Sequence, residues 1–222
     1  MSRFHAKEAL GIHTEMRPYV RARKWLGALL VDNAFHGASM VFRQSPLAHP
    51  RLHGVEVIKD IQYINDDTSS HRLDIYRPKR FSGLLKTVLY IHGGGFRILS
   101  KDTHWLMGLA FARRGYLVLN LSYRLAPENP YPAAVMDCSA AYEWMAEHAT
   151  RYGADLNQLV LAGESAGANL VLGLTLSACL KRSEPWAQRV WNTAVIPKAL
   201  IAACGMLQVT QPRRLLDKSD IP

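Results

Sequence analysis

Cysteine is scarce in this sequence, with three residues in a chain of 222. Cys138, Cys179 and Cys204 are odd in number and widely spaced, which excludes a disulfide framework and a C-x-x-C metal or redox motif. The N-terminus lacks the apolar segment of a secretory signal. The apolar run at 25–31 is far shorter than the about 20 residues that span a membrane. These absences predict a cytoplasmic protein with buried, reduced thiols.

Acidic residues are also few, 18 against 27 Lys and Arg, which gives a net charge of +9. The excess is confined to the two ends, because residues 52–180 carry 12 residues of each sign. A nucleic-acid footprint needs a clustered basic face, so we predict no nucleic-acid partner. The segment 17–30 mixes basic residues with Trp and Leu, a composition compatible with weak contact to a membrane surface. A solvated charged face is the simpler interpretation.

Hydrophobic patterning predicts an α/β fold. After a helical, mixed-polarity region at 1–50, residues 55–64 and 71–76 suggest a strand hairpin. From there on, buried strands alternate with helices. The expected strands are 87–92, 116–121, 158–162 and 199–203, and the expected helices are 104–114, 133–148 and 166–180. This alternation is typical of a mostly parallel sheet flanked by helices, whose sites lie outside the carboxyl ends of the strands.

A first motif lies between strand 158–162 and helix 166–180. Gly163, Glu164, Ser165, Ala166 and Gly167 form a G-x-S-x-G sequence. Glycine two residues before and two after the serine allows a sharp strand-to-helix turn. The turn exposes the Ser165 hydroxyl and directs the N–H groups of the helix N-terminus toward developing negative charge. The motif therefore predicts a nucleophilic serine.

A second motif, His92 followed by Gly93, Gly94 and Gly95, comes directly after a buried strand. Glycines let backbone N–H groups approach a ligand oxygen, and each donor preorganised for an oxyanion supplies roughly 3–4 kcal/mol. The N–H of Ala166 is the natural further donor. No Gly-Lys-Ser/Thr ending follows, so a phosphate loop is poorly supported. We expect the His92 ring to hold the glycine loop by hydrogen bonds, with a role as base as the alternative.

A third segment, residues 123–128 with the sequence YRLAPE, follows strand 116–121 and leads into helix 133–148. Its polar residues are expected to brace this loop. We assign no catalytic role to Glu128 or Asp137.

Taken in this order, HGGGF, YRLAPE and GESAG resemble the hormone-sensitive-lipase-like branch of the α/β-hydrolase fold, over roughly residues 55–205. The resemblance implies hydrolysis of carboxylic esters of short or medium acyl chains, without metal or organic cofactor. It also implies an N-terminal helical cap at 1–50 and a hydrolase core at 51–222. The site residues that it implies are Ser165 as nucleophile, Gly93, Gly94, Gly95 and Ala166 at the oxyanion hole, and His92, Glu164, Gly163 and Gly167 in support.

The sequence departs from this family at the base. Serine needs a histidine to accept its proton, and in this fold the acid and the histidine follow the serine. None of the nine histidines follows Ser165. Three explanations stay open: a core that lacks its last strands, a binding protein without turnover, or an unconventional base such as His92, His104 or a histidine of another chain. Whether this chain is an enzyme is therefore left open.

Overall fold

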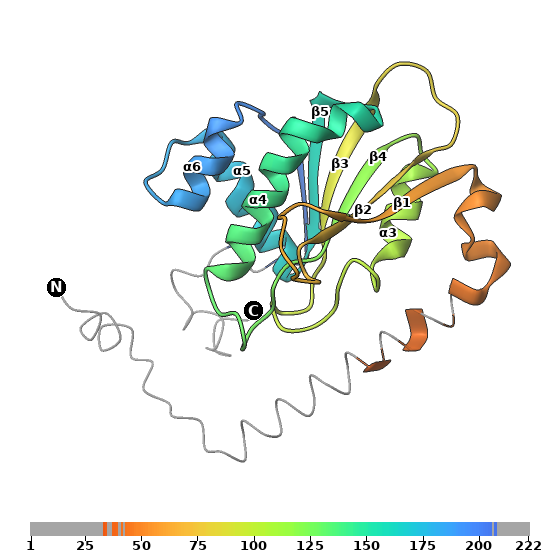
Figure 1. The fold of residues 1–222 in the computed structure, drawn as a ribbon, viewed down its shortest axis with the longest axis horizontal. Coiled ribbons are helices and arrows are strands. Elements are labelled where there is room, and N and C mark those ends of the chain that lie inside the picture. Colours follow the sequence, from red (N-terminus) through yellow and green to blue (C-terminus); the bar gives the residue numbers. More distant parts are fainter. Residues whose placement is uncertain (1–32, 35–36, 40, 42, 206, 208–222) are drawn as a thin grey trace, which may run out of the picture.

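The computed structural model describes residues 33–34, 37–39, 41, 43–205 and 207. Their centre is a six-stranded sheet with the strand order β1-β2-β4-β3-β5-β6 (Figure 1). The strands are β1 (Val55–Gln62), β2 (Arg72–Pro78), β3 (Leu85–Ile91), β4 (Leu117–Leu121), β5 (Ala154–Glu164) and β6 (Ala199–Ala203). The predicted α/β class with a mostly parallel sheet is confirmed.

Strand directions divide the sheet into two parts. β1 and β2 form the predicted antiparallel hairpin, and β2 pairs antiparallel with β4. β4, β3, β5 and β6 are parallel. In the register of these strands, Ile91 lies beside both Leu121 and Gly163. The glycine loop, the YRLAPE segment and the G-x-S-x-G turn therefore leave the sheet at the same edge.

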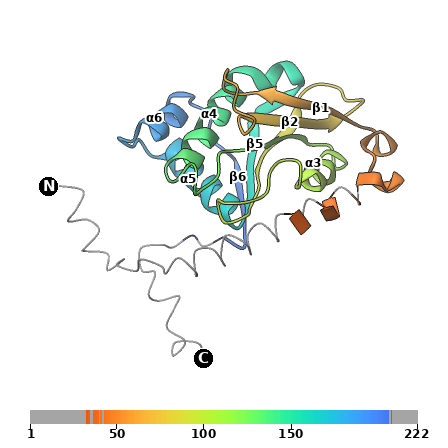
Figure 2. The ribbon, with the colours of Figure 1, turned by 60° about the horizontal axis from the view of Figure 1, so that its bottom comes forward.

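Helices cover both faces of the sheet (Figures 1 and 2). α3 (Trp105–Ala112) lies on one face, and α4 (Ala133–His148), α5 (Ala166–Cys179) and α6 (Pro185–Asn192) lie on the other. Short 3-10 turns are η1 (Pro46–Ala48), η2 (Pro50–His53) and η3 (Ala149–Tyr152). The helix α6 was not predicted, because its eight residues make little more than two turns, too few for periodicity to identify a helix.

The central strands are apolar at consecutive positions because both of their faces are buried. In β3, Leu89 and Ile91 pack into the core under α4 and α5, whereas Val88 and Tyr90 pack under α3. All four side chains are almost fully buried. This two-sided burial explains why the sequence of β3 runs without polar alternation into the glycine loop.

Much of the region assigned to the cap, 1–50, lies outside the described residues, including the basic segment 17–30. Its described part contacts the start of α3. The Trp105 indole N–H donates to Ser39 Oγ at 2.8 Å, and Arg43 donates to the Asp102 carbonyl at 2.9 Å. The boundaries of a cap and a core stay predictions.

Two further predictions concern thiols and membranes. Cys138 is buried, as predicted, but Cys179 and Cys204 are exposed. Burial of all three thiols was therefore a wrong prediction, since Cys179 ends α5 on its outer side and Cys204 follows the edge strand β6. Among the helices in the described part of the chain, none is long and apolar enough to cross a bilayer.

Candidate active site

Ser165 lies at a sharp turn between β5 and α5. Its backbone has φ 49° and ψ −114°, a conformation that L-residues rarely adopt. Glycine is required on both sides of the turn. A Cβ on Gly167 would overlap the Ile91 carbonyl oxygen, and a Cβ on Gly163 would lie 2.6 Å from the Gly167 carbonyl carbon. The motif glycines thus let the turn pass against β3, as the sequence predicts.

The Ser165 N–H is not available to a substrate. It donates to the carbonyl oxygen of Ala203, the last residue of β6, at 2.8 Å. The next amide, that of Ala166, belongs to the first turn of α5, whose N–H groups have no acceptor within the helix. The site therefore directs the amide of Ala166, and not that of Ser165, toward negative charge.

The glycine loop packs directly against this turn. A Cβ on Gly93 would lie 2.9 Å from the Glu164 carbonyl oxygen and 3.4 Å from Ser165 Cβ. Gly94 and Gly95 have φ of 106° and 59°, in the left-handed region that favours glycine. A side chain at Gly94 would also overlap the backbone of the same loop. The structure thus brings together the two glycine-rich motifs that the sequence analysis singled out.

The YRLAPE segment fixes the glycine loop from its other side. The Tyr123 hydroxyl donates to the His92 carbonyl at 3.0 Å, and the Ala126 N–H donates to the Phe96 carbonyl at 2.7 Å. Arg124 in turn is held by the buried carboxylate of Asp137, with its Nη2 2.6 Å from Oδ1. The expected bracing of this loop is present, and Asp137 takes part in it by binding Arg124.

His92 holds the loop through its ring. Its Nδ1–H donates to the Gly93 carbonyl at 2.7 Å, as expected, which leaves Nε2 unprotonated. The side chain is fully buried, and this burial lowers its pKa to about 3. Its ring stacks on Tyr123, with centroids 4.3 Å apart. His92 is therefore a neutral structural residue under the loop.

Sequence reasoning missed an ion pair next to the serine. His104 Nε2 lies 2.5 Å from Glu164 Oε1, and its Nδ1 lies 3.2 Å from the Ser100 carbonyl. Both ring nitrogens thus lie within hydrogen-bond distance of oxygen atoms, and Nδ1 also lies 2.9 Å from the Thr103 hydroxyl. The hydrogen bond from His104 holds the pKa of Glu164 below its usual value. No motif links these residues, and the only available signal was a histidine shortly after the glycine loop.

A buried lysine holds the segment that joins the glycine loop to α3. Lys101 Nζ lies 2.8 Å from Asp60 Oδ1 and 3.0 Å from Asp74 Oδ1. Its backbone is also fixed, because its N–H donates to Ser122 Oγ and its carbonyl accepts from Asn120 Nδ2. These contacts of Lys101 restrict the position of the segment that joins the glycine loop to α3.

Cation-binding clusters of three or more His, Cys, Asp or Glu side chains do not occur within the described residues. A strained serine at a helix N-terminus, faced by a bare glycine backbone, suits attack on a carbonyl group followed by stabilisation of an oxyanion.

A family model described as the alpha/beta hydrolase fold matches residues 88–219, more than half of the chain. The chain belongs to this family. The matched region contains all three motifs, namely the glycine loop, the YRLAPE segment and the G-x-S-x-G turn. The resemblance inferred from the motifs is thereby confirmed.

Among the hydrolase relatives, esterase LipI of Mycobacterium tuberculosis (strain ATCC 25618 / H37Rv) is 48% identical over 84 residues, which are 37% of this chain and 26% of LipI. The structure of esterase LipW from Mycobacterium marinum is 32% identical, with a TM-score of 0.57 over 69% of this chain and 48% of LipW. Esterase B from Lactobacillus rhamnosis, at 23% identity, shares the fold with a TM-score of 0.66, over 83% of this chain and 57% of its own. The chain thus spans well under two thirds of the proteins it matches.

Proposed function

We propose that this chain carries the nucleophile and the oxyanion donors of a serine carboxylic-ester hydrolase. The observation that carries the proposal is the packing of Gly93 against Ser165, which places a side-chain-free loop beside a strained serine at a helix N-terminus. The esterase names of LipI and LipW support the same chemistry. Esters of short or medium acyl chains are the proposed substrates, and the cytoplasm is the proposed location.

In the proposed reaction, Ser165 Oγ attacks the ester carbonyl carbon and its proton passes to a base. The carbonyl oxygen becomes an oxyanion that accepts hydrogen bonds from the N–H groups of Gly93, Gly94 and Ala166. Collapse of this intermediate breaks the bond to the alcohol, which leaves with a proton, and forms an acyl-enzyme. Water then attacks the acyl group and releases the carboxylic acid. Each oxyanion donor contributes roughly 3–4 kcal/mol.

The base is the part of the machinery for which the described residues offer no good candidate. His92 is buried, and its one ring proton is donated to Gly93. His104 is engaged by the Glu164 carboxylate. Burial lowers the pKa of His92 to about 3, so its unprotonated Nε2 is too weak a base for the Ser165 proton, and His104 could accept that proton only by giving up its contact with Glu164. The proposal is therefore limited to the nucleophile and the oxyanion donors.

The test is hydrolysis of a chromogenic acetate or butyrate ester by the chain and by Ser165→Ala, compared at equal concentration. Turnover requires a base other than His92 and His104, and we expect all ester turnover of the wild-type chain to depend on Ser165 and to be lost in Ser165→Ala. Ser177→Ala is a matched control, because Ser177 is a buried serine of the same helix whose hydroxyl donates to the Gly173 carbonyl. Equal rates in the wild-type chain and Ser165→Ala would refute the assignment of the nucleophile.

A further inference from the structure

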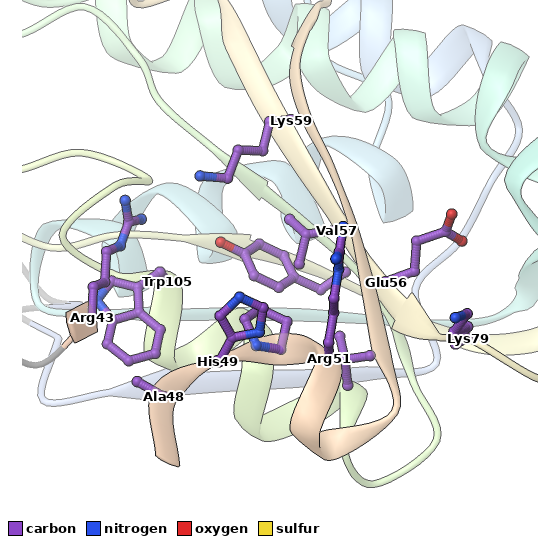
Figure 3. Close-up of a pocket in the computed structure, with 12 residues that line it drawn as sticks. Arg43, Ala48, His49, Arg51, Glu56, Val57, Lys59, Lys79 and Trp105 are labelled. Atoms are coloured by element: carbon purple, nitrogen blue, oxygen red, sulfur yellow. The ribbon is translucent and has the colours of Figure 1, made fainter. Parts of the chain in front are cut away.

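A pocket of about 600 Å³ opens at the outer edge of the sheet, between the 3-10 turns η1 and η2, strand β1 and the start of α3 (Figure 3). Neither Ser165 nor any residue of the glycine loop lines it. Its volume lies within the range of small-molecule sites. We refer to it as the β1 pocket.

The floor of the β1 pocket is apolar. Val55, Tyr76 and Trp105 line it, and all three are almost fully buried members of the apolar cluster under α3. Val57 of β1 adds a partly buried side chain to the same surface. Val55, Tyr76 and Trp105 expose at most 6% of their surface. The apolar surface that a ligand would shield therefore belongs to the partly buried Ala48 and Val57, at about 25 cal/mol for each Å².

The rim of the β1 pocket is positively charged. Five basic side chains line it, which Figure 3 shows around the 3-10 turns, on β1, next to α3 and, for the last of them, directly after β2: Arg43, His49, Arg51, Lys59 and Lys79. The lining contains a single acid, Glu56, and this carboxylate is taken by Arg77 from outside the pocket, at 2.8 Å. The rim thus lacks an acid to balance its charge.

Three of these cations are unneutralised. Arg43 contacts Asp102 at 3.5 Å and lies over the Trp105 ring at 5.8 Å. Arg51, Lys59 and Lys79, in contrast, are exposed and form no ion pair with a carboxylate of the described residues. Like charges that line one pocket repel one another, and an anion that binds among them relieves this repulsion.

We propose that the β1 pocket binds an amphipathic anion, that is, a carboxylate or phosphate group attached to an apolar body. The anionic group would face the cations of the rim, and the apolar body would cover the part of the floor formed by Ala48 and Val57. An inorganic ion would leave this floor exposed to water, and a neutral apolar molecule would leave the rim uncompensated. The inference is independent of the function proposed for Ser165.

Isothermal titration with decanoate, below its micelle concentration, tests the proposal on the full chain. Decanoate should bind at least tenfold more tightly than decanol or inorganic phosphate, and its affinity should fall with added salt. The charge-reversed variant Arg51→Glu/Lys59→Glu should bind decanoate at least tenfold more weakly. Arg114→Glu is the matched control, since Arg114 is exposed at the end of α3 and does not line the pocket.

The neutral variant Arg51→Gln/Lys59→Gln controls for misfolding of the charge-reversed variant, because it keeps polar side chains without adding negative charge. It should also weaken decanoate binding. Ser165→Ala should bind decanoate like the wild type, which separates this pocket from the ester site. Equal affinities for decanol and decanoate, or no change in either double variant, would overturn the proposal. Sedimentation with phosphatidylglycerol vesicles distinguishes a membrane lipid from a free acid as the source of the anion. If the chain sediments with the vesicles and decanoate displaces it, the ligand is a lipid headgroup. If the chain does not sediment with them, the ligand is a free acid.

Discussion

Replacing Lys101 by Met removes one charge from a buried cluster while keeping the length of the side chain. Lys101 is 3% exposed, and its ammonium group lies within 3.0 Å of both Asp60 and Asp74. Asp74 is fully buried, and its Oδ2 has no hydrogen-bond partner within the described residues. Without Lys101 it would keep, within the described residues, a single hydrogen bond, from the Asp60 N–H at 2.9 Å.

The expected loss of stability depends on which carboxylate loses its partner. Breaking a buried ion pair on one side costs about 3–5 kcal/mol, because the remaining charge is uncompensated. The bond to Asp60 adds little, because that side chain is 56% exposed and solvent screens it. We therefore expect Lys101→Met to lower the free energy of unfolding by about 3 kcal/mol at pH 7.

Urea denaturation followed by circular dichroism measures this loss. The double variant Lys101→Met/Asp74→Asn should recover part of the stability, since it leaves no unpaired buried charge. Burial raises the pKa of Asp74, and the loss of Lys101 raises it further. The deficit of Lys101→Met should therefore shrink as the pH falls through this raised pKa and Asp74 becomes neutral. Lys86→Met, at an exposed position of β3, serves as control. A loss below about 1 kcal/mol at pH 7 would refute the reasoning.

Further predictions concern the serine turn. Gly167→Ala should destabilise the protein by about 3 kcal/mol and abolish esterase activity. Gly173→Ala is the control in the same helix, because a Cβ there would meet open space, and thermal melting should show it to be neutral or stabilising. Glu164→Gln should cost about 1 kcal/mol at pH 7, because it removes the charged bond to His104 from a side chain that is 41% exposed. The pKa of Glu164 is lowered in the fold, so this contribution is present above 4.5 and lost as the pH falls through the lowered pKa. Melting curves of both proteins should therefore converge in acid, and a constant difference would contradict the ion pair.

The centre of the sheet was predictable from sequence because β3 and β4 are buried on both faces and helices alternate with the parallel strands, whereas the edge strands β1 and β6 are partly exposed. The motif glycines were predictable because each allows a contact that a side chain would block, as Gly167 does against β3. The pairing of His104 with Glu164 was not predictable, since it depends on how two distant loops meet at the edge of the sheet. The β1 pocket was missed for the same reason, as its cations come from separate elements.

The hydrogen bond from the Ser165 N–H to Ala203 couples the serine turn to the edge strand β6. An amide proton in such a bond exchanges with solvent when the bond opens, so its exchange rate reports local unfolding. If β6 separates from β5, the Ser165 amide is released and the strained turn loses a constraint that no local residue replaces. Exchange protection at this one amide therefore measures how much of the time the nucleophile is held in its functional conformation. A ligand that slows this exchange would be acting on the assembly of the site.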